Sequence, residues 1–310
     1  TKVREIPNIQ ISPHVILGLL KIGFPIMLIG LMFILLRSVD RIIIAVLLSK
    51  QMLGYFAIGT IVSGLIYLSI ADIVKVIFGP RIMENLGNTG DINLIKKYFI
   101  EPTIIIAYFT PFLVGTLYLG IHIPIKYFLA KYFVAIGVIQ ILVLGSFFLA
   151  IVMLPLLVCV SLNKQVNIIF LMLIAIISDA ILSYTFIVYG WGLEGVAIGT
   201  GISYFILSFI SLLYALKQFN VKLDEYIKLF ALIYAPFLYA FCLLFILDNF
   251  IIFNTNGFWN DIFLTTLQIF IFFLMFSIVF IFFRKHMAFK KLIDSLPIPN
   301  RKTQTVLVDF

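Results

Sequence analysis

The chain has 310 residues, of which 63% are hydrophobic and 12% charged, and its mean hydropathy is +1.18. Soluble domains carry about 45–50% apolar and about 25% charged residues, so this composition excludes an ordinary soluble protein and indicates an integral membrane protein. The net charge of +8 does not indicate nucleic-acid binding, because the basic residues cluster beside hydrophobic segments, as topological charge bias produces.

Eight hydrophobic segments are long enough to cross a bilayer, which takes about 20 apolar residues in a helix. In chain order they are residues 16–48, 53–79, 102–121, 135–161, 167–189, 195–216, 229–248 and 262–283. The first of them is overlong. Runs of this length without period-two alternation are not the strands of a membrane barrel. We therefore predict an all-α integral membrane protein with eight transmembrane helices.

The loops between these segments differ sharply in charge. If residues 1–14 lie in the cytoplasm, they and the other inside loops (80–98, 162–166, 217–228 and 284–310) hold fifteen Lys and Arg residues, whereas the outside loops hold three. Positive charge marks the cytoplasmic side. The pattern predicts a multi-pass protein with both ends of this chain in the cytoplasm and a basic tail at 284–310, next to anionic membrane lipids.

Two connecting segments carry polar patterns of their own. Residues 81–98 contain a Gly-Asn-Thr-Gly-Asp sequence and are predicted to form a polar hairpin between helices. Residues 122–134 are amphipathic and rich in aromatic residues, a pattern typical of a segment lying on the membrane surface. We expect this second segment on the outer surface.

Charged side chains inside the spans are candidate site residues, because each costs about 2.5–3.5 kcal/mol at the bilayer centre on insertion scales. The first span holds Arg37, Asp40 and Arg41 at i, i+3 and i+4, which would place both guanidinium groups and a carboxylate on one helix face. They form either an interfacial ion-pair cluster or an anion site with bidentate Arg geometry for a phosphate. Lys21 either extends to the interface or contacts the same phosphate.

The remaining intramembrane charges are Asp72, Lys75 and Asp179. Asp72 and Lys75, at i and i+3, most simply neutralise each other. Asp179 has no cation within one helical turn, so it faces the bundle interior, is protonated or pairs with another helix. This makes Asp179 a candidate for proton or ion coupling, with a structural interhelical hydrogen bond as the alternative.

Catalytic patterns are missing from the sequence. The three His residues (His14, His122 and His286) are dispersed without metal-ligand spacing, and there is neither a phosphate-binding loop nor a nucleophile with an adjacent base. Cys159 and Cys242 both fall within hydrophobic spans, where small buried apolar residues are the ordinary interpretation. We expect neither an enzyme nor a metal or other cofactor.

A family resemblance rests on LLKIGFPIMLIGLMFILLRSVDRIIIAVLLSKQMLGYFAIGTIVSGL, and on the later segments KYFVAIGVIQILVLGSFFLAI and YGWGLEGVAIGTGISYFI. The first resembles the start of a lobe in the polysaccharide flippases of the multidrug/oligosaccharidyl-lipid/polysaccharide exporter superfamily. The matching positions are Gly23, Pro25, Asp40, Arg41, Gly54, Tyr55, Gly192, Gly195 and Ala197. The chain departs from the family pattern at Asp179, where Asn is frequent.

The resemblance implies a domain organisation. Residues 1–14 would be a cytoplasmic linker, 15–216 a six-helix C-terminal transporter lobe, 217–283 two additional transmembrane helices and 284–310 the cytoplasmic tail. Such transporters have two six-helix lobes around a central cavity. Because the chain begins at Thr1 instead of Met, we expect an N-terminal lobe of the same protein as a partner.

The function that this resemblance implies is translocation of a polyprenyl-pyrophosphate-linked oligosaccharide across the bacterial cytoplasmic membrane for surface polysaccharide synthesis. The substrate-binding residues would be Arg37 and Arg41, oriented by Asp40, with Lys21 in support. A cation-coupled drug exporter of the same superfamily is the alternative, although such a site would favour carboxylates over Arg. A membrane polysaccharide polymerase or ligase would need a larger outer loop than this chain has.

Overall fold

A computed structural model describes residues 13–89, 92–219, 221, 223–250 and 257–284. Its elements are α1 (Pro13–Leu36), α2 (Val39–Leu47), α3 (Lys50–Ile73), the π-helical segment η1 (Val74–Phe78), α4 (Gly79–Thr89), α5 (Ile92–Gly120), α6 (His122–Phe128), the 3₁₀ segment η2 (Ala130–Ala135), α7 (Ile136–Ser161), α8 (Gln165–Val188), α9 (Gly192–Lys217), α10 (Leu223–Phe250) and α11 (Phe258–Arg284). Within the described residues there is no strand, and eight spans are long and apolar enough to cross a membrane. The predicted fold class is confirmed.

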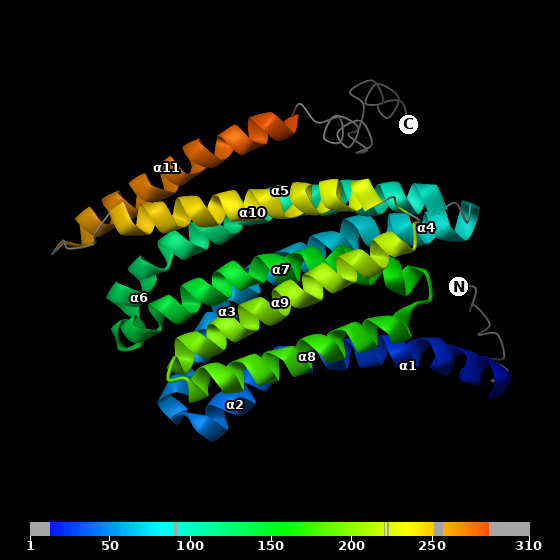
Figure 1. Ribbon diagram of the computed structural model, residues 1–310, viewed down its shortest axis with the longest axis horizontal. Coiled ribbons are helices and arrows are strands. Elements are labelled where there is room, and N and C mark those ends of the chain that lie inside the picture. The colour runs from blue at the N-terminus through cyan, green and yellow to red at the C-terminus, as the bar shows by residue number, and fades with distance from the viewer. Residues whose placement is uncertain (1–12, 90–91, 220, 222, 251–256, 285–310) are drawn as a thin grey trace, which may run out of the picture.

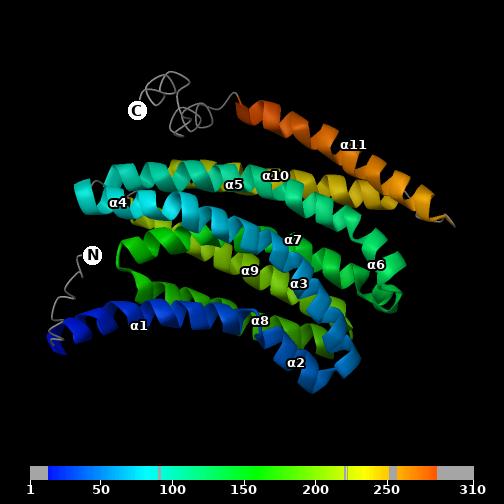
Figure 2. The ribbon, with the colours of Figure 1, turned by 180° about the vertical axis from the view of Figure 1, so that it is seen from behind.

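The helices are stacked in layers (Figure 1). Helices α1 and α8 form one face, α3, α7 and α9 the middle, and α5 and α10 the next layer, with α11 on the far side. Figure 2 shows the same order from behind, and the helix contacts agree with it: α1 packs on α8, α8 on α9, α9 on α7, and α7 on both α3 and α5. Helix α7 is therefore the centre of the bundle.

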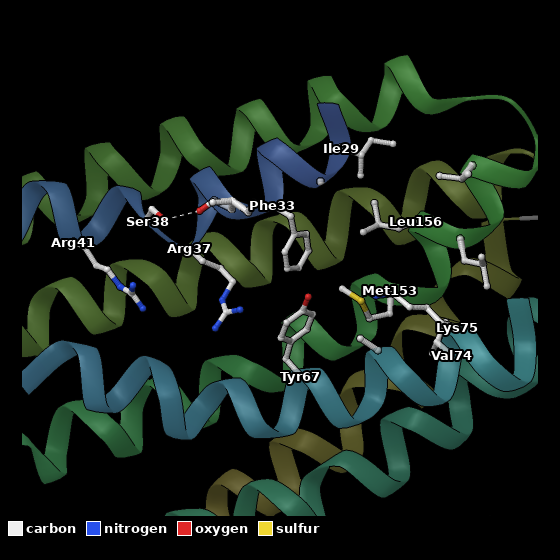
Figure 3. Close-up of a pocket in the computed structure, with 15 residues that line it drawn as sticks. Ile29, Phe33, Arg37, Ser38, Arg41, Tyr67, Val74, Lys75, Met153 and Leu156 are labelled. Atoms are coloured by element: carbon white, nitrogen blue, oxygen red, sulfur yellow. Dashed lines mark hydrogen bonds between the residues drawn. The ribbon is translucent and has the colours of Figure 1, made fainter. Parts of the chain in front are cut away.

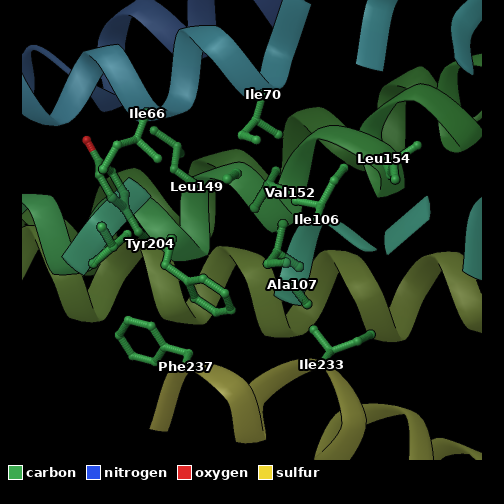
Figure 4. Close-up of a cluster of buried hydrophobic side chains, with 14 of the residues drawn as sticks. Ile66, Ile70, Ile106, Ala107, Leu149, Val152, Leu154, Tyr204, Ile233 and Phe237 are labelled. Carbon is green, nitrogen blue, oxygen red and sulfur yellow. The ribbon is translucent and has the colours of Figure 1, made fainter. Parts of the chain in front are cut away.

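Helices α7 and α9 approach closely because both present glycine at their crossing. A Cβ atom built on Gly145 would lie 3.1 Å from the Cα atom of Gly201. Small residues at such crossings let two backbones come into van der Waals contact, which is the main attractive force between helices in lipid. The buried side chains around this crossing form one large cluster, part of which is shown in Figure 4, where Leu149 and Tyr204 lie between Ile66 and Phe237.

Helices α10 and α11 are attached through α5. Helix α10 packs on α5, and α11 packs on both. The ring of Phe272 lies over Gly115 of α5 so closely that a Cβ atom there would be 2.3 Å from ring atom Cε1. The predicted boundary between a lobe at 15–216 and two added helices stays a prediction, and residues 1–12 and 285–310, which include most of the predicted linker and tail, lie outside the described residues.

Two local predictions need correction. The first span is not one continuous helix, because α1 ends at Leu36 and α2 begins at Val39, with a turn at Arg37 and Ser38. The polar segment 81–98, predicted as a polar hairpin between helices, is itself helical and not a loop in its described residues. Helix α4 and the first turns of α5 extend through it on both sides of residues 90–91, which lie outside the described residues. The amphipathic segment 122–134 forms α6 and most of η2.

Candidate anion-binding cavity

The break between α1 and α2 opens onto a cavity of about 550 Å³ that α1, α2, α3, η1 and α7 enclose. Most of its lining is apolar, including Ile29, Phe33, Met153 and Leu156. Three cationic side chains also line it, Arg37, Arg41 and Lys75, and no lining residue is a carboxylate. Figure 3 shows Arg37 and Arg41 projecting from the α1–α2 break toward α3, with Lys75 at the other end of the cavity.

Arg37 is held by an aromatic stack. The ring of Tyr67 is 5.2 Å from the guanidinium carbon of Arg37, centroid to Cζ, and 5.2 Å from the ring of Phe33, centroid to centroid. A guanidinium group over an aromatic face is attracted by the ring quadrupole without losing its hydrogen-bond donors. Gly64 leaves room for the guanidinium group, since a Cβ atom there would lie 3.1 Å from Nη2 of Arg37.

Arg41 is positioned by α3. Its Nη2 atom donates a hydrogen bond of 2.8 Å to Oγ1 of Thr60, which in turn donates to the backbone carbonyl of Ala57. One hydroxyl uses one of the five donors of the guanidinium group. No ion pair joins Arg37 or Arg41 to a carboxylate in the part of the chain that the structure describes. The remaining donors can therefore bind an anion.

Lys75 enters the cavity from η1, where the helix is locally wound as a π-helix. Such π-helical turns shift the register of the following residues and occur frequently at functional sites. The predicted pairing of Lys75 with Asp72 is not seen as an ion pair, although both residues are described. Lys75 thus adds a third positive charge to the cavity.

Asp40 lies away from the cavity, which corrects the prediction that it shares a face with the two arginines. The turn at Arg37 and Ser38 rotates α2 relative to α1, so that Asp40 is buried (1% exposed) against α8 and accepts a hydrogen bond of 3.2 Å from Ser183. Lys21, sixteen residues before Arg37 on α1, is exposed and does not line the cavity.

Asp40 meets Asp179 in the protein interior. Asp179 is fully buried on α8, and neither of its carboxylate oxygens has a hydrogen-bond partner among the described residues. Its polar neighbours are the carboxyl group of Asp40 and the hydroxyl group of Ser203 on α9. Of the three alternatives that the sequence left open for Asp179, the structure shows a side chain that faces the bundle interior. The pair of acidic side chains is a feature that the sequence did not indicate.

The acidic pair and the arginines are neighbours through Tyr204. This side chain is 8% exposed and interacts electrostatically with Asp40, Asp179, Arg37 and Arg41. Tyr204 and Arg37 also border a small hollow, about 10 Å³, with Thr60 and Ser146. That volume is close to the minimum for one water molecule. The open cationic cavity therefore has a buried pair of acidic side chains, Asp40 and Asp179, behind Tyr204.

Sequence reasoning identified the charged residues but missed their partners. Thr60, Gly64 and Tyr67 of α3 fix the two arginines, and nothing in α1 or α2 points to them. The spacing of Thr60 and Gly64, four residues apart, was a usable indication, because small residues at i and i+4 mark a face of close approach between helices.

The sequence comparisons match the segment that carries this cavity. A family model described as polysaccharide biosynthesis protein matches residues 1–85, which include every charged residue of the cavity lining. Over these 85 of 310 residues the chain is similar to that family. No curated protein and no solved structure matches the chain.

Proposed function

We propose that this multi-pass membrane protein is a flippase that moves a polyprenyl-pyrophosphate-linked oligosaccharide across the bacterial cytoplasmic membrane for polysaccharide synthesis. The observation that carries the proposal is the cavity at the α1–α2 break, where three cations and no carboxylate line a mostly apolar pocket. The match of residues 1–85 to a polysaccharide biosynthesis family supports the same assignment.

The chemistry of the cavity suits a pyrophosphate. Arginine offers planar paired donors that fit phosphate oxygens bidentately. Each of Arg37 and Arg41 has one side anchored, by Tyr67 and by Thr60, and the other free. A lipid-linked sugar carries its negative charge on the pyrophosphate next to the lipid, so Arg37 and Arg41 hold the headgroup while the aromatic rings of Phe33 and Tyr67 border it.

The experiment compares headgroup translocation in proteoliposomes by the protein and its Arg37→Gln and Arg41→Gln variants. Hydrogen bonds to charged groups contribute about 1.5–3 kcal/mol each, so each variant should translocate a labelled lipid-linked oligosaccharide roughly ten- to a hundredfold more slowly. Lys131→Gln, an exposed lysine of η2 outside the cavity, is the matched control and should be unaffected. Undiminished transport in both arginine variants contradicts the proposal.

A cation-coupled drug exporter is the competing function, because Phe33 and Tyr67 could stack on a cationic drug. Three positive charges without a carboxylate disfavour such a ligand. The same proteoliposomes, offered a fluorescent cationic dye in place of the lipid-linked sugar, separate the two functions. Dye transport that increases when Arg37 is replaced by Gln favours the exporter.

The acidic pair supplies coupling in the proposed cycle. Two adjacent carboxylates that are both removed from solvent cannot both carry a negative charge without a large electrostatic cost. In our proposal Asp40 and Asp179 share one proton, and its exchange, which alters the charge beside Arg41, accompanies the movement of the anionic headgroup. A role as a purely structural interhelical bond is the alternative for Asp179.

Coupling is tested by imposing a proton gradient, and separately a sodium gradient, across the same proteoliposomes. Transport by the unaltered protein should follow the proton gradient, and transport by Asp179→Asn should proceed without responding to it. A response to sodium alone assigns the pair to a metal cation instead. Transport by Asp179→Asn that still follows the proton gradient leaves Asp179 with a structural role.

A further inference from the structure

Helices α9 and α10 are separated by a seam that runs along the side of the bundle. Helix α10 packs on α5 and α11 and only sparsely on α9. The seam contains two apolar hollows. One, of about 850 Å³, is bordered by α8, α9 and the beginning of α10; the other, of about 480 Å³, is bordered by α7, α9 and the second half of α10.

A bridge near the middle of α9 divides the seam. The hydroxyl groups of Ser208 and Tyr234 are 2.7 Å apart and hydrogen-bonded. Aromatic rings close the gap around this bond, with the centroid of Tyr234 at 5.8 Å from Phe205 and 5.9 Å from Phe230. The two hollows are therefore separate compartments, one toward each end of the bundle.

The larger hollow has the length of one leaflet. From Ser208 at the bridge to Lys217 at the end of α9 there are nine residues, which is about 14 Å of helix at 1.5 Å per residue. The hydrocarbon core of a bilayer is about 30 Å thick, so one leaflet contributes about half of that. Its walls between these points include Ile210, Leu213 and Phe230.

The end of this hollow farthest from the Ser208–Tyr234 bridge carries polar and cationic side chains. Lys217 is exposed and lines the hollow, and no described residue forms a hydrogen bond or ion pair with it. Beside it, Tyr214 accepts a hydrogen bond from Asn167. The first turn of α10 carries two acids, Asp224 and Glu225. Glu225 is bound to Lys96 at 3.5 Å, and neither acid forms an ion pair with Lys217 among the described residues. An apolar hollow of leaflet length that ends in an unpaired lysine matches the shape and charge of an anionic phospholipid.

The hollow does not serve the cargo cavity. It shares no lining residue with the cavity of Arg37 and Arg41. That cavity is bordered by α7 and this hollow by α9, and α7 and α9 pack closely on each other. A lipid whose headgroup binds at Arg37 cannot place its chain against Leu213. A lipid of the surrounding leaflet therefore fits this hollow better than the transported cargo does.

We propose that the hollow between α9 and α10 is a binding site for an anionic phospholipid, with its phosphate at Lys217 and an acyl chain extending along α9 to the Ser208–Tyr234 bridge. The site is independent of the proposed transport function. It adds a lipid-mediated contact between α9 and α10 to the one that the Ser208–Tyr234 bridge makes.

The protein is first placed in nanodiscs that contain equal amounts of phosphatidylglycerol and phosphatidylcholine, and is then purified out of them. The test measures the amount of each lipid that stays bound to the purified protein. The protein should retain phosphatidylglycerol in excess. Loss of one charge-assisted contact is about 1.5 kcal/mol or more, so Lys217→Gln should reduce that excess roughly tenfold. Lys50→Gln, an exposed lysine at the start of α3 that does not border the hollow, should retain the excess.

A second variant tests the hollow itself. Ala231 is exposed and lines it, so Ala231→Phe should fill the hollow without disturbing the core and should lower retention of both lipids. Equal retention of the two lipids by the unaltered protein means general annular contact and overturns the proposal. A phosphatidylglycerol excess that survives both Lys217→Gln and Ala231→Phe places the lipid elsewhere and overturns it as well.

Discussion

Two consecutive residues of α2, Asp40 and Arg41, point into different surroundings. Arg41 projects into the cationic cavity and donates to Thr60, whereas Asp40 is buried and accepts from Ser183. Adjacent residues on an α-helix point about 100° apart, since there are about 3.6 residues per turn. The turn before α2 sets which of them faces the cavity. A spacing rule that groups Arg37, Asp40 and Arg41 on one face assumes a continuous helix and fails for Asp40 for this reason.

The buried carboxyl group of Asp179 is expected to lower the free energy of unfolding of the protein. It is fully buried beside a second carboxyl group, that of Asp40. Replacement by Asn keeps the shape, removes the possibility of a second negative charge beside Asp40 and replaces the shared proton by a permanent amide donor to Asp40. We predict that Asp179→Asn increases the free energy of unfolding by about 1–3 kcal/mol, measured as a higher melting temperature in detergent.

The control for this prediction is Asp72→Asn, which changes an exposed carboxylate in the last turn of α3, just before η1. Its melting temperature should stay close to that of the unaltered protein. A lower melting temperature for Asp179→Asn means that the acidic side chain is bound to a stabilising cation, and the shared-proton description of the pair would then be wrong.

At the level of elements, irregular helices position the charged groups. The α1–α2 turn directs Arg37 and Arg41 toward α3, and the π-helical segment η1 directs Lys75 into the same cavity. Departures from α-helical geometry at membrane depth leave backbone groups that must be satisfied by protein or water. Both departures border the cavity. The backbone groups that they leave without helical hydrogen bonds therefore lie next to the proposed anion site.

The attachment of α11 to α5 depends on a glycine. The Cβ atom of an alanine at position 115 would lie 2.3 Å from Cε1 of Phe272, whose ring is fully buried. We predict that Gly115→Ala destabilises the protein by about 1–3 kcal/mol through overpacking, seen as a lower melting temperature in detergent. Gly54→Ala is the matched control, because a Cβ atom there meets nothing within 4 Å.

For Gly54→Ala we expect no loss of stability, since alanine is favoured over glycine inside a helix by roughly 0.5–1 kcal/mol. The comparison separates the effect of contact with Phe272 from the general effect of replacing a helical glycine. Equal melting temperatures for the two variants would show that Phe272 moves aside without cost and that α11 is only loosely attached.

For the whole molecule, the loops predicted to be cytoplasmic lie at one end of the bundle. In Figure 1 the start of α1, the α4–α5 hairpin, the α7–α8 connection and the α9–α10 connection are all at the right-hand end. The fifteen-to-three division of Lys and Arg between the two sides then predicts which end faces the cytoplasm.

This orientation is tested with single cysteines in a chain without Cys159 and Cys242, both replaced by Ser. Lys131 and Lys164 are exposed at opposite ends of the bundle. In intact cells a membrane-impermeant maleimide should label Lys131→Cys, and it should label Lys164→Cys only after permeabilisation. The reverse labelling would place the basic loops outside and would contradict the charge rule for this protein.

The sequence by itself determined the fold class, the eight spans and the residues that carry charge inside the membrane. Hydropathy and charge are sums over local segments, and in a membrane each span must satisfy its own backbone hydrogen bonds, so local patterns suffice. The candidate arginines Arg37 and Arg41 followed from the same reasoning, because an intramembrane charge is conspicuous wherever it is packed.

Only the tertiary structure decided which charges meet. The separation of Asp40 from the arginines, the pairing of Asp40 with Asp179 across α2 and α8, and the anchoring of Arg41 by Thr60 of α3 all depend on how the helices pack against one another. The two-residue turn between α1 and α2 sets these contacts. Hydropathy does not reveal this turn, because a break in a helix changes the directions of its side chains but not the composition of the span.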